Sequence, residues 1–208
     1  MIRRAIAAGV DWIQIREKDL SGRELIHLAR ESVAAASGTR TRIIVNDRLD
    51  VAIAAHASGV HLGEDSLPVR AVAAWRESHA TEGASFLVGA SCHSLEQAES
   101  AERDGADYIV FGPVFETPSK VSFGPPQGIE RLRKVCGEIQ IPTLAIGGVN
   151  AANASECIRA GAAGIAAIRV FQEIRSLPQS PEAPASAIRS DEQELRNLIE
   201  QLRSLKRN

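Results

Sequence analysis

Two cations and an amide stand at alternating positions at the end of the first apolar run of the chain. Gln14, Arg16 and Lys18 are two residues apart, so in an extended strand their side chains point to the same side. An arginine fork and a lysine point charge both bind phosphate oxygens, so this group suits a polyanionic substrate. The alternative is a salt-bridged strand end, in which Glu17 and Asp19 neutralise the two cations.

Acidic residues follow the next two apolar runs. Asp47 comes after the second run, and Asp65 comes after the third, with Glu64 beside it. Mg²⁺ prefers a few carboxylates together with water and substrate phosphates, so Asp47 and Asp65 predict a magnesium site if they face each other. In the alternative, Asp47 and Asn46 cap the helix that follows them, and the acidic pair is simply solvated.

Two later segments offer phosphate-binding groups of different kinds. Thr117, Ser119 and Lys120 supply two hydroxyls and an ammonium group, within a long polar segment typical of a lid or of a stretch without fixed structure. Gly147 and Gly148 follow a further apolar run, where bare glycine amides can cradle a phosphate beside a helix N-terminus. Two adjacent glycines are equally what a tight turn requires.

Short apolar runs rich in Val and Ile alternate with amphipathic stretches along the whole chain. The runs are Val10–Arg16, Arg42–Asn46, Gly59–Leu62, Phe86–Ser91, Tyr108–Val114, Thr143–Ile146 and Gly164–Val170. Runs of this kind are typical of strands buried on both faces of a parallel sheet. The stretches between them predict helices, among them Gly22–Ala36 and Ser94–Arg103, and Ser94 with Gln97 forms a capping-box signature.

The repeated strand–helix unit predicts an α/β fold, specifically a (β/α)8 TIM barrel. A doubly wound open sheet would carry a Gly-rich nucleotide fingerprint after an early strand, and the sequence has none. A barrel places functional residues at the C-terminal ends of many strands, which is where the polar groups described above stand. Because only seven runs are present, we expect the first strand to be missing from this chain, through a start set too far downstream or through degeneration.

Composition divides the chain into three parts. Residues 1–176 are expected to form the barrel body, and residues 177–188, rich in Pro, Ser and Ala, a linker. Residues 189–208 carry leucines at helical spacing. They predict a C-terminal helix that packs on the barrel, with packing on a partner subunit as the alternative.

Composition also narrows the class of function. The chain has 208 residues, a formal charge of −2 and 4% aromatic residues, which gives no reason to expect binding to nucleic acid or to an anionic membrane. No apolar run approaches the ~20 residues needed to span a bilayer. Three widely spaced cysteines and an N-terminus unlike a signal peptide indicate a cytoplasmic protein. We expect small phosphorylated substrates as its partners, and assembly into a homo-oligomer is left open.

Seven motifs, in order along the chain, together resemble the thiamine phosphate synthase family and its close relative, the thiazole tautomerase family. They are Gln14–Lys18, Val45–Arg48, Gly59–Gly63, Gly89–His93, Gly105–Tyr108, Gly112–Lys120 and Ala145–Gly148. The resemblance implies a (β/α)8 barrel that joins 4-amino-2-methyl-5-pyrimidinylmethyl diphosphate to a thiazole phosphate, giving thiamine phosphate and pyrophosphate. It also implies Mg²⁺ as cofactor, and a dissociative step in which the diphosphate leaves before the thiazole nitrogen attacks.

Matching positions of the family motifs imply a role for each site residue. By this resemblance, Gln14 contacts the pyrimidine, and Asp47 binds Mg²⁺. Asp65 is a second metal ligand if its loop is shifted by one residue, because Ser66 stands at the matching position. The diphosphate is held by Arg16, Lys18, Asn46, Ser91 and Lys120, of which all but Asn46 are candidate catalytic residues. The thiazole phosphate contacts Thr117, Ser119 and Gly148.

Three features depart from the synthase pattern. Ser66 replaces the second metal-binding Asp, Arg169 stands where synthases tend to have Ser, and the first strand is absent. Ser66–Leu67 and His93–Glu96 resemble the tautomerases instead, but Pro113 stands where these can place a catalytic His. We therefore prefer a synthase. A tautomerase-like enzyme and a non-catalytic protein that binds thiazole phosphate or thiamine phosphate are the alternatives.

Overall fold

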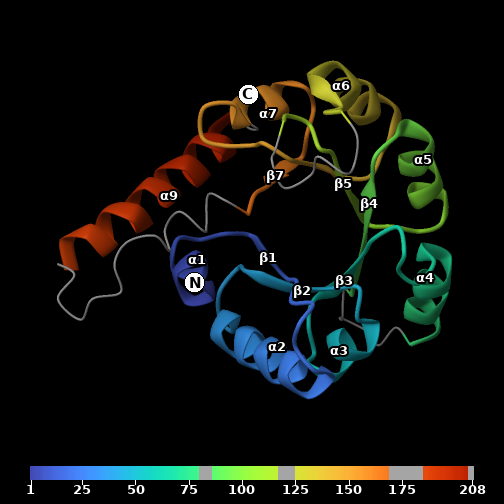
Figure 1. Ribbon diagram of the computed structural model, residues 1–208, viewed down its shortest axis with the longest axis horizontal. Coiled ribbons are helices and arrows are strands. Elements are labelled where there is room, and N and C mark those ends of the chain that lie inside the picture. Colours follow the sequence, from blue (N-terminus) through green and yellow to red (C-terminus); the bar gives the residue numbers. More distant parts are fainter. Residues whose placement is uncertain (80–85, 117–124, 169–184, 206–208) are drawn as a thin grey trace.

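A single sheet of seven parallel strands forms the centre of the computed structural model, which describes residues 1–79, 86–116, 125–168 and 185–205. Each strand pairs with the next one along the chain, and the sheet curls so that its strands surround a common axis (Figure 1). The strands are β1 (Trp12–Ile15), β2 (Arg42–Asn46), β3 (Gly59–Leu62), β4 (Leu87–Cys92), β5 (Tyr108–Phe111), β6 (Thr143–Ile146) and β7 (Gly164–Ala166).

Helices follow the strands and lie on the outer, convex side of the sheet (Figure 1). They are α1 (Ile2–Ala7), α2 (Gly22–Ala36), α3 (Leu49–Ala54), α4 (Val69–Ser78), α5 (Leu95–Arg103), α6 (Gly128–Glu138), α7 (Ala154–Arg159) and α9 (Ala185–Leu205). Helix α2 begins with a complete capping box between Ser21 and Glu24, and these hydrogen bonds lower the pKa of the Glu24 carboxyl. None of the helices in the described ranges is long and apolar enough to cross a membrane.

The hydrophobic core lies between the convex face of the sheet and the helices. Alternate strand residues such as Ile43, Val45 and Val60 are fully buried there, against the apolar sides of α2, α3 and α4. A second cluster continues the core under α5, α6 and α7, and it includes the fully buried Ile109 and Phe111 of β5. Because the outward-facing residues supply this core, the inward-facing residues of the same strands are left for other tasks.

The sequence predicted this architecture correctly. All seven expected strands are present, and β2, β3 and β6 have the predicted ends. The predicted strand over 108–114 is too long, since β5 ends at Phe111, just before Gly112 and Pro113. Within the described residues, β1 and β7 each pair on one side only, so the sheet has the seven strands expected of a barrel that lacks its first strand.

Helix α9 spans the outside of the gap between the two edge strands, where it contacts both α1 and α7 (Figure 1). Leu195 of α9 is buried, and Leu202 packs against the cluster of the core that includes residues of α7. The guanidinium of Arg196 donates to the carbonyl of Ala7, at the end of α1, over 2.7 Å. The helix starts at Ala185, four residues before the expected residue 189, and residues 169–184 of the composition-based division lie outside the described ranges.

Arg203 makes the densest polar contact between α9 and the N-terminal part of the chain. Its Nη2 donates to the carbonyl of Gly9 and to Oδ1 of Asp11, each at 2.8 Å. We expect Arg203→Ala to lower the free energy of unfolding by about 1 kcal/mol, since charged hydrogen bonds are worth more than this when buried and less when solvated. Urea denaturation followed by circular dichroism measures the change.

Arg133→Ala is the matched control, because its ion pair with Glu130 joins two exposed side chains on the surface of α6. Its effect should stay within about 0.5 kcal/mol. Equal effects of the two substitutions would contradict a stabilising role for the contact between α9 and the loop that joins α1 to β1.

Candidate functional site

The C-terminal ends of β1 and β2 bring the first predicted site residues together. The Nε2 amide group of Gln14 donates to Oδ1 of Asn46 over 2.8 Å, which joins the two neighbouring strands through their inward-facing side chains. Strand β1 ends at Ile15, so Arg16 and Lys18 lie in the exposed loop that follows it. The expectation that all three side chains point to one side of a strand therefore applies only to Gln14. Among the described residues neither cation forms an ion pair, so the predicted alternative of a salt-bridged strand end is not observed.

Asp47 holds an unusual backbone conformation immediately after β2. Its φ is +66°, a left-handed conformation that Asp and Asn tolerate better than most residues but that still has an energetic cost. Its amide donates to the carbonyl of His61 over 2.8 Å, which anchors the turn to β3. The neighbouring Arg48 pairs with Asp50 at 2.6 Å, and within the described residues the Asp47 carboxylate has no hydrogen bond or ion pair.

The expected alternative role of Asp47 and Asn46 as a helix cap is not observed. Helix α3 begins after Arg48, and no side chain caps its first turn. The Asn46 side chain is engaged with Gln14 instead. The exposed Asp47 carboxylate neither caps a helix nor forms an ion pair within the described part of the chain, so it is available to a ligand.

In the loop after β3, Ser66 takes part in a hydrogen bond with the backbone, whereas Asp65 is exposed. The Ser66 hydroxyl accepts a hydrogen bond from the Gly63 amide over 2.7 Å, so it closes the turn from inside. Asp65 and Glu64 are exposed on the same turn. Strand β3 is the neighbour of β2, so the turns that carry Asp65 and Asp47 follow adjacent strands.

The donor set around Asp47 fits a hard cation of the Mg²⁺ type. Exposed carboxylate oxygens on two adjacent turns are the ligand type that Mg²⁺ takes when it shares a site with phosphates and keeps several waters. Within the described part of the chain, no cluster of three or more His, Cys, Asp or Glu side chains is arranged to hold a metal by itself. A metal bound here would therefore depend on substrate oxygens for part of its shell.

Ser91, one of the residues expected to bind diphosphate, is half-buried on the inner face of β4. Its hydroxyl lies 2.9 Å from Nε2 of His61, whose Nδ1 lies 3.3 Å from the hydroxyl of Tyr108. The sequence favours a buried, hydrogen-bonded role for His61 over that of a base, and the ring is 3% exposed. The partnership with Tyr108 was not predicted, although the Gly in the middle of β4 is a sequence signal for close approach.

The loops after β5 and β6 interlock at the same rim. The amide of Val114 donates to the carbonyl of Ile146, and that of Phe115 to the carbonyl of Gly147. Gly148 has φ +64°, and a Cβ there would stand 2.5 Å from the Glu116 carbonyl oxygen. The two glycines predicted to cradle a phosphate are therefore also required for this packing.

Three predicted phosphate-binding residues, Thr117, Ser119 and Lys120, lie outside the described ranges, as does Arg169.

Cys92, next to His93, is 1% exposed, and burial raises the pKa of its thiol to about 12, which makes it a poor nucleophile at neutral pH. The Nδ1 of His93 contacts the carbonyl of Gly112, so this ring is bound to the loop after β5.

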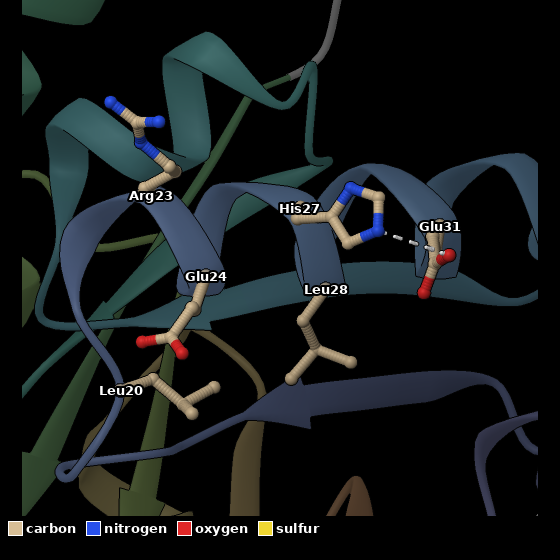
Figure 2. Close-up of a pocket in the computed structure, with 6 residues that line it drawn as sticks. All are labelled: Leu20, Arg23, Glu24, His27, Leu28 and Glu31. Carbon is tan, nitrogen blue, oxygen red and sulfur yellow. Dashed lines mark ion pairs between the residues drawn. The ribbon is translucent and has the colours of Figure 1, made fainter.

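A shallow hollow on the outer surface runs along α2 and is separate from the predicted site residues. Figure 2 shows its lining, with His27 and Glu31 joined by an ion pair of 3.3 Å. The lining consists of Leu20, Arg23, Glu24, His27, Leu28 and Glu31. Five of these residues belong to α2, and Leu20 lies in the loop before it.

Fold and site together define a class of protein: a parallel α/β barrel with cationic, amide and carboxylate side chains at the C-terminal ends of its strands. A profile of the family described as thiamine monophosphate synthase matches residues 1–171. The chain belongs to this family.

Individual relatives agree with this assignment. The thiamine-phosphate synthase of Methanocella arvoryzae is 45% identical over 161 residues, which cover 77% of this chain and 73% of the relative. That of Methanoculleus marisnigri is 43% identical over 161 residues, covering 77% and 74%. The solved structure of thiamine phosphate pyrophosphorylase from Pyrococcus furiosus superposes with a TM-score of 0.78 at 33% identity, covering 97% of this chain and 88% of that one.

The interlocked loops after β5 and β6 generate a test of packing at the rim. Gly148→Ala should lower the free energy of unfolding by about 3 kcal/mol, because a positive φ and a clash with Phe115, 2.7 Å from the added Cβ, both count against it. Thermal and urea denaturation measure the loss.

Gly38→Ala separates the two contributions. Gly38 has a similar φ of +73°, but nothing lies within 4 Å of its Cβ position. This control should cost about 1 kcal/mol, the backbone term alone. If both variants lose the same amount, the loops after β5 and β6 are not packed as described.

Proposed function

We propose that the chain is a thiamine-phosphate synthase that condenses 4-amino-2-methyl-5-pyrimidinylmethyl diphosphate with a thiazole phosphate. In this reaction the bond between the pyrimidine methylene carbon and the diphosphate oxygen breaks, and its electron pair leaves with pyrophosphate. The thiazole nitrogen then donates its lone pair to the methylene carbon, which gives thiamine phosphate. Family membership supports the reaction type, and the residues at the rim support the substrate class.

One observation carries the proposal: charged groups suited to a diphosphate and its metal stand after neighbouring strands, and they form no ion pairs with other described residues. Arg16 and Lys18 lie exposed after β1 and form no ion pair within the described residues. Asp47 stands after β2, and its carboxylate forms no ion pair with another residue that the structure describes. A fold that needed these charges only for stability would pair them with each other.

The residues act mainly on the leaving group. Departure of a diphosphate needs charge neutralisation more than it needs a strong base, so Arg16 and Lys18 stabilise the negative charge that develops on the departing oxygens. The paired amides of Gln14 and Asn46 offer remaining donor and acceptor positions to the pyrimidine and the diphosphate, which are thereby held in line. Ser91 supplies a hydroxyl from the inner face of β4.

Asp47 and Asp65 would hold Mg²⁺ together with the diphosphate, and the metal would supply Lewis-acid stabilisation of the leaving group. Asp65 is the better candidate for the second position, because the Ser66 hydroxyl already accepts a hydrogen bond from the Gly63 amide. Thr117, Ser119 and Lys120 are proposed to complete the phosphate sites from the segment after β5, with Gly148 at its border.

The first test is pyrophosphate release by the purified chain with both substrates and Mg²⁺, with each component omitted in turn. We expect release only from the complete mixture, together with formation of thiamine phosphate. Release without the thiazole phosphate would indicate a simple hydrolase. Tight binding of thiazole phosphate without release would favour the tautomerase-like enzyme or the non-catalytic binding protein.

Asp47→Asn tests the metal site without disturbing the backbone, since Asn tolerates a left-handed φ as well as Asp does. The Mg²⁺ concentration for half-maximal pyrophosphate release should rise about tenfold or more, because a carboxylate charge is lost from the ligand set. The free energy of unfolding should change by less than about 0.5 kcal/mol.

Asp104→Asn is the matched control, because it removes the charge of an acid after α5 that pairs with Arg70 of α4, away from the predicted site. Its Mg²⁺ dependence should equal that of the unsubstituted protein. An unchanged Mg²⁺ dependence in Asp47→Asn would remove Asp47 from the metal site.

A further inference from the structure

Three inner-face positions lie in one row across the middle of the sheet. Parallel pairing sets His61 of β3 beside Gly89 of β4, and Gly89 beside Tyr108 of β5. A Cβ at position 89 would stand 2.1 Å from Cζ of Tyr108, so the tyrosine ring occupies the space that any larger residue would fill. The missing side chain lets Tyr108 reach across β4 and contact His61.

Tyr108 is held firmly in this position. Its ring packs against Trp12 of β1 with centroids 4.6 Å apart in a T-shaped arrangement, and against His61 with centroids 5.6 Å apart. Tyr108 is 2% exposed. Burial raises the pKa of the Tyr108 phenol well above its usual range, so the hydroxyl keeps its proton and can donate it.

His61 continues the contact toward the rim. Its Nδ1 lies 3.3 Å from the Tyr108 hydroxyl, and its Nε2 lies 2.9 Å from the hydroxyl of Ser91. Ser91 stands two residues after Gly89 on β4, one side-chain layer nearer the C-terminal ends of the strands. The order from the interior to the site is therefore Tyr108, His61 and Ser91.

Proton positions along this order decide what Ser91 can offer. A neutral imidazole has one N–H donor and one acceptor nitrogen. If the Tyr108 hydroxyl donates to Nδ1, then Nε2 carries the proton and donates to Ser91, and the serine proton is free for another acceptor. In the other tautomer, Ser91 gives its proton to Nε2 and offers only lone pairs, which repel an anion.

We propose that Tyr108 and His61 are positioning residues that fix the Nε2–H tautomer and so turn the Ser91 hydroxyl into a hydrogen-bond donor for an anionic oxygen of the substrate. The proposal rests on the proposed function for the identity of that oxygen, a diphosphate oxygen. The tautomer itself is a property of the chain, and it can be measured without substrate.

Nuclear magnetic resonance of protein labelled with ¹⁵N-histidine tests the tautomer directly. The His61 signals, assigned as those lost in His61→Asn, should show a protonated Nε2 and an unprotonated Nδ1. In Tyr108→Phe, which keeps the ring and removes the hydroxyl, both shifts should move toward the average of two exchanging tautomers. A protonated Nδ1 in the unsubstituted protein would overturn the proposal, and this spectrum decides even if Tyr108→Phe does not fold.

Kinetics test whether Tyr108 acts through Ser91. Ser91→Ala should lower kcat about 100-fold, as loss of one donor to a developing negative charge does. Tyr108→Phe should lower kcat about tenfold, the usual effect of removing an outer hydrogen-bond partner. The double variant should be no slower than Ser91→Ala alone, and multiplied losses would overturn the proposal.

Ser32→Ala is the matched control, because it also removes a buried hydroxyl, one that donates to the Leu28 carbonyl within α2. Its kcat should be unchanged. If the unsubstituted chain releases no pyrophosphate, the proposed function fails, and binding of inorganic pyrophosphate with Mg²⁺ replaces kcat in the same comparison. Equal pyrophosphate affinity in Ser91→Ala and the unsubstituted protein would then overturn the role given to Ser91.

Discussion

Hydrogen bonding between parallel neighbours is the constraint on which the rest of this molecule depends. Each strand pairs with the next one in the sequence, so all seven C-terminal ends, and the loops that follow them, meet at one rim. Strand alternation then sends every second side chain outward to the helices and the others inward. The same ladder therefore builds the hydrophobic core and presents the polar groups of Gln14, Asn46 and Ser91 to a common space.

Backbone strain and close approach occur together at that rim. Asp47 has a left-handed backbone directly after a strand whose central residues are fully buried. Gly147 and Gly148 also have positive φ, directly after β6. Unfavourable conformations of this kind persist where surrounding structure fixes them, and they are common at functional sites. Here the fixed parts are strands, so side chains at their ends are held with little freedom.

The sequence predicted the strands well because buried parallel strands have a strong apolar signature. It predicted α2 because Leu25, Leu28, Ala29 and Val33 form a regular apolar face. Helix α3, with six residues, is too short to show a periodic pattern. The polar groups at strand ends could be identified by type and position. Whether Asp47 caps a helix or is available to a ligand could not be predicted. The answer depends on its φ and on whether Arg48 pairs with Asp47 or with Asp50.

The contact between Tyr108 and His61 could not be predicted from the sequence, for a different reason. The two residues are 47 positions apart, and they meet only because the register sets Gly89 between them. The register belongs to a pair of strands, and it cannot be read from the sequence of either strand. Ser66 is a similar case, since only the geometry of its turn shows that its hydroxyl accepts from Gly63.

The contact between α9 and the N-terminal part of the chain has a consequence for the order in which the molecule folds. Arg203 and Gly9 are 194 positions apart, whereas each β-strand pairs with one nearby in the chain. Closing so long a loop costs more entropy than pairing neighbours, and the contact gains little until the sheet exists to hold α1 and α7 in place. The sheet should therefore form first, with α9 docking last and detaching first, so its amides should exchange with solvent at a lower opening free energy than those of β2 to β5.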